Sequence, residues 1–572
     1  MRTSRFGPTE REQALLRMEK ESFDLLVVGG GVTGCGAALD AASRGLSVAL
    51  VEQRDFASGT SSRSSKLFHG GLRYLEQFQF GLVREALREQ TLMLETLCPH
   101  LAKPVSFGIP LTKGLWQRLY LGAGTLLYDL IGGRRALPRH RHLSAAATRK
   151  RFPDLALPGL SGAIVYHDAQ MDDARHTLTL ARTAGEHGAV LASSVRQLDF
   201  VERGGRVTGA RVQCLETGRR IEIRARQVVS ATGVWTDRVQ SQFDLGELRV
   251  RAAKGIHILV PRDRIRAEGG LVLRTPKSVL FLIPWKHHWI IGTTDTDWNL
   301  DLAHPAASQR DVDYLLDQLN AAVSHPLRRD DIEGVYAGLR PLLTGESDAT
   351  SKLSREHAVT EPAPGLLSIA GGKYTTYRVM AKDAVDAAVR HFDEPVPASR
   401  TQAIPLLGAT GFRDRWDRRF LLAREHGLPA ERIEHLLGRY GSLVDELFEA
   451  IAREPELAEP LEGAPDYLAV EAHYATTHEG ALHLDDVLTR RTRISVETFD
   501  RGIAAARPVA AIMGRILGWD DAALQREIQH YEARVRAERE SQQQPDDRTA
   551  DAARMGAPDV RTGPSRSQAE PL

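Results

Sequence analysis

FDLLVVGGGVTGCGAALDAASRGLSVALVEQ, residues 23–53, is the stretch that decides the fold of this chain. Its apolar run at Leu25–Val28 is typical of a buried parallel strand, and the small residues at Ala37–Ala42 suit a helix that lies close on a sheet. A second apolar run at Val48–Glu52 predicts the next strand. The stretch therefore predicts a strand, a tight turn, a helix and a second strand, which together form the first unit of a doubly wound nucleotide-binding sheet.

Three glycines between the first strand and the helix have the spacing of a dinucleotide-binding turn. Gly29 permits the sharp turn, Gly31 lets a pyrophosphate approach the backbone at the helix N-terminus, and Gly34 lets helix and strand pack closely. Glu52 ends the second strand, where a carboxylate accepts a hydrogen bond from a ribose hydroxyl and disfavours a ribose phosphate. The pattern predicts a dinucleotide and does not choose between NAD and FAD.

Two later motifs favour FAD. An apolar strand ends in Ala-Thr-Gly at 231–233, which in many FAD proteins returns the chain beside the first nucleotide-binding turn. Within Leu366–Val389 another strand ends in two glycines and a helix follows, so that the helix N-terminus would stabilise negative charge at the flavin pyrimidine edge. An ordinary strand-turn-helix unit is the simpler alternative for this last motif.

Composition and charge exclude several classes of protein. The 572 residues carry 75 Lys and Arg against 74 Asp and Glu, a formal net charge of +1, so the global charge indicates no nucleic-acid surface. The three cysteines have neither CxxC nor metal spacing, which argues against a secreted disulfide scaffold. The charged start of the chain lacks the apolar core of a secretory signal, and we expect a cytoplasmic protein.

The distribution of apolar runs predicts four segments. Strand signals cluster in the middle of the chain, which indicates a second, mainly antiparallel sheet interleaved with the nucleotide-binding elements. From about residue 400 the periodicity is helical, and after residue 541 bulky apolar residues are almost absent. We predict an N-terminal extension at 1–20, an oxidoreductase domain with an interleaved substrate subdomain at 21–398, a helical domain at 399–540 and a disordered tail at 541–572.

The motifs together support a family resemblance. In chain order they are GGGVTGCG, TSSRSSKLFHGGLRYLE, MDDARHTL, SATGVW, KGIHILVPR, IPW, IIGTTDTD, YAGLRPLL and GGKYTTYR. This set resembles the FAD-dependent, quinone-linked glycerol-3-phosphate dehydrogenases, which belong to the glycine-oxidase-like flavoproteins; Val234 departs from the usual Pro. The resemblance implies an α/β fold: a Rossmann-like FAD domain of the glutathione-reductase and glycine-oxidase type, a mainly antiparallel substrate subdomain and a C-terminal α-helical domain.

The resemblance also implies which residues contact FAD. In this family the segment after the second strand wraps the flavin, with small hydroxyl residues near the cofactor and two glycines that let the backbone approach the ring. A turn residue with a solvated hydroxyl is the alternative for any single serine, and His69 is expected as a scaffold residue rather than a catalyst. The implied cofactor-binding residues are Gly29, Gly31, Gly34, Glu52, Thr60, Ser61, Ser62, Ser64, Ser65, Lys66, His69, Gly70, Gly71, Ala231, Thr232, Gly233, Gly371, Gly372, Lys373 and Thr375.

A phosphorylated substrate requires converging cations, and the resemblance places Arg73, Arg340 and Lys373 in the substrate pocket, together with Tyr74 and His257. The implied reaction oxidises sn-glycerol 3-phosphate to dihydroxyacetone phosphate, with hydride leaving C2 for flavin N5 and electrons passing to a quinone. We expect His257 to take the hydroxyl proton, aided by Arg340. A hydrogen-bonded core histidine is the alternative at that position.

Several alternatives concern the acceptor and the substrate. The motifs do not separate a quinone from oxygen, so a glycerol-3-phosphate oxidase is the main alternative. A non-catalytic flavoprotein-fold binding module is disfavoured because the cofactor and cation motifs are all present, and an amino-acid substrate is disfavoured because one carboxylate needs only one arginine. The sequence has no EF-hand pattern, so we expect no metal, and it is compatible with a homo-oligomer.

One stretch, Gly114–Gly133, has membrane character. Arg118 and Asp129 interrupt it, so a spanning helix is not expected. An amphipathic helix on the inner face of the cytoplasmic membrane, beside the basic segment 134–142, would suit anionic lipid and quinone chemistry. The plainer alternative is a partly buried helix followed by a solvated loop.

Overall fold

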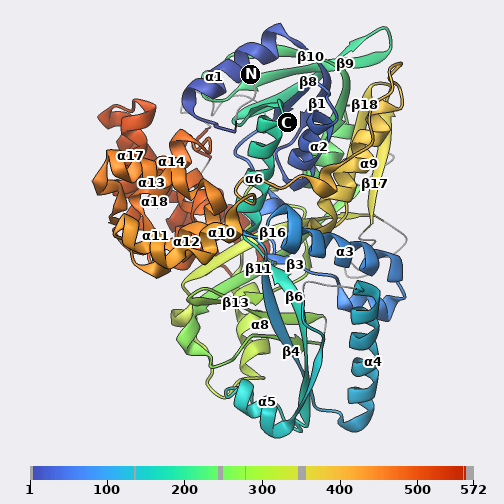
Figure 1. Cartoon of the computed structure of the whole chain (residues 1–572), viewed down its shortest axis with the longest axis vertical. Coiled ribbons are helices and arrows are strands. Elements are labelled where there is room, and N and C mark those ends of the chain that lie inside the picture. The colour runs from blue at the N-terminus through green and yellow to red at the C-terminus, as the bar shows by residue number, and fades with distance from the viewer. Residues whose placement is uncertain are drawn as a thin grey trace.

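The structure is a computed structural model that describes residues 4–133, 137–242, 249–276, 278–344, 356–557 and 559–561. Two large sheets lie one above the other in Figure 1, and a helical domain packs at their side. The first sheet has the order β17-β18-β10-β1-β2-β7, and the β8–β9 hairpin continues from β10. Its strands are β1 (Ser22–Val28), β2 (Val48–Val51), β7 (Val190–Ala192), β8 (Val195–Arg203), β9 (Arg206–Cys214), β10 (Arg220–Ser230), β17 (His357–Ala363) and β18 (Leu366–Gly371).

The centre of this first sheet is parallel, as the opening stretch predicts. β18, β10, β1, β2 and β7 pair in parallel, so their carboxyl ends meet at one edge. The helices of this part are α1 (Pro8–Lys20), α2 (Val32–Ser43), α3 (Phe80–Leu92), α6 (Asp173–Glu186), α7 (Thr236–Gln240) and α9 (Tyr377–Val389). Small residues let α2 and α9 pack closely: a Cβ on Gly36 would lie 3.0 Å from the Tyr377 ring and 3.1 Å from Ala381.

The second sheet is mainly antiparallel, which confirms the fold class predicted from the clustered strands. Its order is β15-β11-β14-β13-β12-β4-β6-β3, with β16 paired to β11 and β5 to β6. The strands are β3 (Leu67–Phe68), β4 (Lys103–Leu111), β5 (Arg141–Ser144), β6 (Gly162–Gln170), β11 (Val250–Pro261), β12 (Gly270–Arg274), β13 (Val279–Trp285), β14 (His288–Gly292), β15 (Thr296–Asp297) and β16 (Gly334–Leu343). The helices α4 (Gly114–Gly132), α5 (Ala145–Arg151) and α8 (Gln309–Asn320) belong to this half.

The C-terminal part is helical, as its periodicity predicts. It contains one short hairpin, β19 (Pro460–Leu461) and β20 (Ala464–Leu468). Its α-helices are α10 (Phe412–Asp417), α11 (Arg419–His426), α12 (Ala430–Tyr440), α13 (Val444–Arg453), α14 (Ala469–Thr477), α15 (Leu484–Asp486), α16 (Ile494–Glu497), α17 (Ile503–Leu517), α18 (Asp521–Ser541) and α19 (Asp547–Arg554).

The predicted disorder after residue 541 is wrong for the part that the structure describes. Helix α19 forms there, with Ala550 fully buried, and Asp547 accepts from the buried ammonium of Lys254 at 2.5 Å. The prediction rested on the scarcity of bulky apolar residues, whereas this segment is held by ion pairs with charges that lie inside the molecule. Residues 562–572 of the predicted tail lie outside the described residues.

Helix α4 lies along the edge of the second sheet, at the lower right of Figure 1. Only two of its side chains, those of Thr125 and Tyr128, are buried. Its other face exposes large apolar side chains: Leu115, Trp116, Leu119, Tyr120, Leu126, Leu127 and Leu130. Among the described residues, no helix has the length and apolar character needed to cross a membrane.

Candidate active site

The glycine-rich turn joins β1 to α2 at the carboxyl edge of the parallel sheet. Gly29 has φ +114°, and a Cβ there would lie 2.6 Å from the Ala231 carbonyl oxygen. A Cβ on Gly34 would clash with the Gly29 carbonyl oxygen, so this turn can form only with glycine at both positions. Gly31 caps α2 without a side-chain hydrogen bond; the Val32 N–H donates to Ser61 Oγ, and the N–H groups that follow in the first turn could donate to a diphosphate.

Glu52 follows β2 at the same edge. One carboxylate oxygen accepts from the Gly30 N–H at 2.7 Å and the other from the Arg54 N–H at 2.9 Å. These bonds orient the carboxylate toward the glycine turn and leave it further acceptor capacity, since a carboxylate offers about four lone-pair sites. The carboxylate is therefore placed to accept from the hydroxyls of a ribose.

The two motifs that favour FAD end on neighbouring strands of the same edge. The Ala231 N–H donates to the Val28 carbonyl at 2.9 Å, so the segment with Thr232 and Gly233 returns beside the first turn, as predicted. Gly371 and Gly372 end β18 with φ +79° each. A Cβ on Gly372 would lie 2.5 Å from the Met380 sulfur, which explains the need for glycine there.

Hydroxyl side chains of the loop 60–66 make hydrogen bonds to several different parts of the molecule. Ser61 Oγ accepts from the Val32 N–H at 2.9 Å and so lies at the N-terminus of α2. Thr60 donates to the Leu339 carbonyl on β16 at 2.6 Å, and Ser65 Oγ is 2.9 Å from His257 Nε2. Ser62 is buried and its hydroxyl lies 3.5 Å from the Gly59 carbonyl. The loop therefore connects the nucleotide-binding turn to the second sheet.

Lys66 and Ser64 lie against Asp173 at the start of α6. Lys66 Nζ is 2.7 Å from Asp173 Oδ1, and Ser64 donates through its N–H and its hydroxyl to Oδ2 at 2.8 and 2.7 Å. Arg493 of the helical domain also reaches Asp173, at 2.5 Å. Both Lys66 and Asp173 are almost fully buried. A contact of Lys66 with the cofactor stays a prediction. Its ion pair with Asp173 joins the loop to α6, and Arg493 joins the same carboxylate to the helical domain.

The loop 69–74 closes against the segment that follows β18. Thr375 donates to the His69 carbonyl at 3.2 Å, and Lys373 Nζ lies 3.6 Å from the centre of the Tyr74 ring. Gly70 has no room for a side chain, because a Cβ there would lie 2.3 Å from the Tyr128 hydroxyl. These contacts bring together the predicted substrate residues Tyr74 and Lys373.

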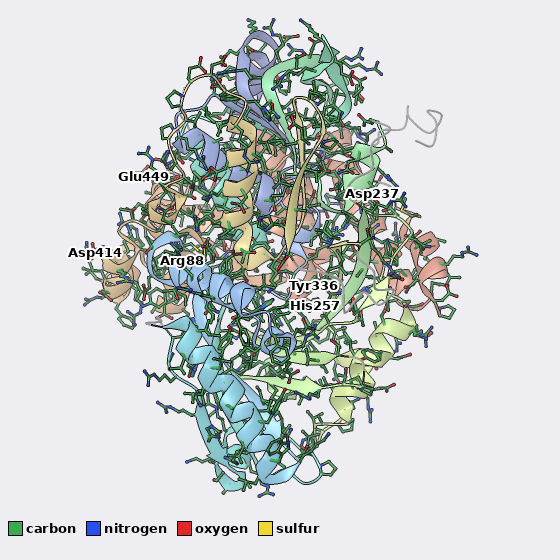
Figure 2. The ribbon with its side chains drawn as sticks, turned by 90° about the vertical axis from the view of Figure 1, so that its right-hand side faces the viewer. Arg88, Asp237, His257, Tyr336, Asp414 and Glu449 are labelled. Carbon is green, nitrogen blue, oxygen red and sulfur yellow. The ribbon has the colours of Figure 1, made fainter. Side chains whose placement is uncertain are left out.

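His257 lies on β11, in register with Gly292 of β14 and Tyr336 of β16. The Tyr336 ring stacks on the imidazole with centroids 4.8 Å apart, and Figure 2 shows the two side chains next to each other. Burial, with the nearby charges of Arg340 and Lys66, holds the pKa of His257 well below its usual range. The imidazole is therefore neutral, and within the described residues its Nδ1 has no hydrogen-bond partner. With Ser65 at Nε2, the ring can accept a hydrogen bond from a hydroxyl at Nδ1.

Arg340 lies on β16, the strand beside β11. Its guanidinium donates to Thr293 Oγ1 at 3.0 Å, to the Thr294 carbonyl at 3.2 Å and to Asp295 Oδ1 at 3.2 Å. Backbone packing leaves space for it, since a Cβ on Gly255 would lie 2.5 Å from Arg340 Nη2. A fixed guanidinium is thus held close to the neutral imidazole of His257.

Arg73 has a different hydrogen-bond partner from those of His257 and Arg340. Its Nη1 donates to the Ser278 hydroxyl at 3.1 Å, which places it over the β12–β13 turn of the second sheet. Its role as a phosphate ligand stays a prediction.

Sequence reasoning assigned no role at this site to four side chains that position it. Tyr336 stacks on His257; its place two residues before Gly338 and four before Arg340, on one face of a strand, is a signal that could have found it. Asp168 Oδ1 accepts from the Gly70 N–H at 3.2 Å and from Tyr128 at 2.7 Å. Gln90 donates to Asp168, and Arg493 donates to Asp173. Both come from segments far away in the sequence, and no local sequence pattern indicates their positions.

Comparisons with known proteins agree with this geometry. The sequence model of the family described as "FAD dependent oxidoreductase" matches residues 24–378, and that of the "C-terminal domain of alpha-glycerophosphate oxidase" matches residues 399–524. The chain is 54% identical over 560 residues to "Glycerol-3-phosphate dehydrogenase" of Mycobacterium leprae, covering 98% of this chain and 96% of the relative. It is 36% identical over 546 residues to the human mitochondrial protein named glycerol-3-phosphate dehydrogenase, of which it covers 74%.

A solved structure resembles the whole fold. The glycerol-3-phosphate dehydrogenase of Bacillus halodurans complexed with FAD superposes with a TM-score of 0.78 at 29% identity, covering 93% of this chain and 98% of that chain. The cradle formed by Gly29, Gly31, Gly34 and Glu52 suits the diphosphate and ribose of such a cofactor. The predicted FAD cofactor is thereby confirmed.

Proposed function

The chain belongs to the family of FAD-dependent glycerol-3-phosphate dehydrogenases, and we propose that it oxidises sn-glycerol 3-phosphate to dihydroxyacetone phosphate. The observation that carries this proposal is the neutral imidazole of His257 on the strand next to the fixed guanidinium of Arg340. Oxidation of a secondary alcohol needs a base at the hydroxyl, and a phosphorylated substrate needs a cation at the other end. The two groups supply these functions side by side.

Each pocket residue has a task in this proposal. Arg340 and Lys373 bind the phosphate end of the substrate, and Arg73 adds a third cation from the other side of the loop. His257 accepts the proton of the C2 hydroxyl at Nδ1, while Ser65 and the stacked Tyr336 hold the ring in place. Tyr74 packs against Lys373 and limits the exposure of the pocket to water.

FAD, when bound, supplies the hydride acceptor at flavin N5 and passes the electrons on to a quinone. Gly29, Gly31, Gly34 and Ser61 would hold its diphosphate and Glu52 its ribose. The flanking segments 231–233 and 371–375 would bind nearer to the flavin, since they lie at the same edge of the sheet.

Steady-state kinetics with two acceptors test the proposal. We expect the purified holoenzyme to turn over sn-glycerol 3-phosphate with a soluble quinone at least about tenfold faster than with oxygen alone, a difference of about 1.4 kcal/mol in barrier. Faster turnover with oxygen would make the protein an oxidase. Arg340→Gln should lower kcat/KM by about 100-fold or more, because it removes the cation proposed to pair with the substrate phosphate, a loss of about 2–5 kcal/mol. Unchanged kcat/KM in this variant would remove Arg340 from the substrate site.

We also propose that the exposed apolar face of α4, residues Leu115, Trp116, Leu119, Leu126 and Leu130, lies on an anionic membrane surface. The Trp116 side chain is 77% exposed and the Leu115 side chain 69%, values unusual for a helix that packs on a sheet. Exposed basic residues lie beside the helix, at Lys113, Arg139 and Arg141. Apolar side chains with flanking cations are the pattern of an interfacial helix, and such a position would bring the enzyme to a membrane quinone.

Vesicle flotation tests this position of α4. The holoenzyme should float with vesicles that contain about a third anionic lipid, and Trp116→Asp should reduce the floated fraction several-fold because the charge opposes burial in the interface. Phe420→Asp is the matched control, since Phe420 is a 57% exposed apolar residue on α11 of the helical domain. Equal flotation of both variants and the wild type would contradict the proposal.

A further inference from the structure

A cavity lined by arginines lies where the C-terminal segment meets the loop 60–66 and the residues 303–304. Six arginine side chains line it against only two aspartates, Asp485 and Asp559. A second cavity next to it shares Arg63, His304, Arg534 and Arg554 with the first. The six arginines are Arg54, Arg63, Arg490, Arg534, Arg554 and Arg561.

Three of these arginines are neutralised by close carboxylates. Arg490 lies 2.5 Å from both Asp55 and Asp486, and Arg561 lies 3.0 Å from Asp486. Arg534 pairs with Asp485 and, at 2.9 Å, with Glu538. These ion pairs account for the helical-domain side of the cavity, and they leave little carboxylate charge for the other three arginines.

The remaining three arginines meet at residues 303–304 with weaker partners. Arg54 and Arg63 both donate to the same Ala303 carbonyl, at 3.3 and 3.4 Å. Arg554 Nη2 is 3.4 Å from His304 Nδ1. The carboxylates nearest to Arg54 and Arg554 are at 3.7 and 3.6 Å, and Arg63 has no ion pair within the described part of the chain.

Like charges surround Arg63. Burial, followed by the charges of Arg54, Arg534, Arg554 and Arg490, lowers the pKa of Arg63 to about 9. A carbonyl oxygen shared by two guanidiniums does not offset their repulsion, because it carries only a partial charge. A bound anion would relieve it, and planar guanidiniums with several donors match the oxygens of a phosphate.

We propose that Arg54, Arg63 and Arg554 bind a small polyanion that carries a phosphate or diphosphate group, at a site separate from the substrate pocket. Two of its three ligands lie outside the residues assigned to substrate and cofactor, and the third, Arg63, belongs to the cofactor loop but turns its guanidinium to Ala303. Asp559 of the C-terminal segment lies 3.7 Å from Arg54 and 3.8 Å from His304, so its carboxylate competes with the anion. The site therefore couples the C-terminal segment to the loop that reaches Ser65 and His257.

Calorimetric titration of the FAD-saturated holoenzyme with inorganic pyrophosphate tests the site, with sodium chloride at matched ionic strength as the reference. We expect saturable binding that Arg63→Gln weakens at least tenfold. Asp559→Asn should bind several-fold more tightly, because it removes the competing carboxylate. Arg203→Gln, which changes an exposed arginine paired with Glu222 on the surface, should bind as the wild type does.

Two further variants and readouts separate this site from the others. Arg340→Gln should keep the pyrophosphate binding; loss of binding there would place the anion in the substrate pocket and overturn the proposal. A reduced FAD content in Arg63→Gln would assign this guanidinium to the cofactor and overturn it as well. Equal affinity in the wild type and Arg63→Gln, or a response that sodium chloride reproduces, would also contradict the site.

Discussion

Two regions of this molecule use buried charge in opposite ways. At the interface with the helical domain, cations are matched by carboxylates: Lys66 and Arg493 both pair with Asp173 at 2.5–2.7 Å. At the proposed substrate site, the Arg340 guanidinium donates to a hydroxyl, a carbonyl and one carboxylate, that of Asp295 at 3.2 Å, and Lys373 lies over an aromatic ring. We propose that the first set of charges holds the domains together and that the second set meets a ligand.

The largest effect is expected in the pocket. His257→Gln should lower kcat by about 10²- to 10⁴-fold, the usual contribution of a general base, while FAD content stays at the wild-type level. His426→Gln is the control, because His426 is an exposed histidine of α11 that lies outside the pocket. Anaerobic single-turnover measurements of flavin absorbance give the rate. A kcat within threefold of the wild type would show that His257 is a core histidine and not the base. It would also contradict the proposed difference between the two regions.

At the interface the expected effect is on stability. Asp173→Asn removes a buried carboxylate that Lys66 and Arg493 share, so the free energy of unfolding should fall by about 3–5 kcal/mol, the cost of breaking a buried ion pair. Asp199→Asn removes an exposed pair with Arg211 and should cost below about 1 kcal/mol. Chemical denaturation of the holoenzymes gives both values. If Asp173→Asn instead kept its stability and lost FAD, Lys66 would belong to the cofactor site as the sequence predicts.

Much of the fold could be predicted, because short sequence motifs indicate the parallel sheet. The turn at Gly29–Gly34 and its return partner at Ala231 follow from backbone requirements that a short motif carries. The ion pair of Lys66 could not be predicted, because its partner Asp173 lies on a helix more than a hundred residues away in the sequence. The same limit explains α19: its polar sequence contains no apolar signal, and its stability depends on Lys254, far away in the sequence.

A second interface charge gives a pH dependence. Burial lowers the pKa of His483, and hydrogen bonds to Glu216 and Glu527 raise it. The result is a pKa raised to about 10. This pKa exceeds the unfolded value of about 6.5. The contribution of charged His483 to the free energy of unfolding is therefore fully present below pH 6.5 and is lost as the pH rises through 10. The difference in melting temperature between the wild type and His483→Gln should therefore be large at pH 6 and shrink toward pH 10. A difference independent of pH would show that the histidine is not charged in the folded protein.

The smallest effect is expected for the ring beside the base. Tyr336→Phe loses a hydrogen bond to the Ser64 carbonyl at 3.0 Å and keeps the stacking on His257. The loss should cost about 1 kcal/mol and lower kcat by fivefold or so. Tyr336→Leu, which also removes the stacked ring, should lower kcat further. Equal kcat in both variants would mean that the ring does not position the imidazole.

The most direct test of the account is an anaerobic absorbance titration of the holoenzyme with sn-glycerol 3-phosphate and, separately, with glycerol. The account predicts that the phosphorylated substrate bleaches the oxidised flavin band and that glycerol at the same concentration does not, because Arg340 and Lys373 need the phosphate. The bleaching should be lost in Arg340→Gln at the same substrate concentration. Equal bleaching by both alcohols, or a flavin that neither one reduces, would contradict the assignment of the pocket.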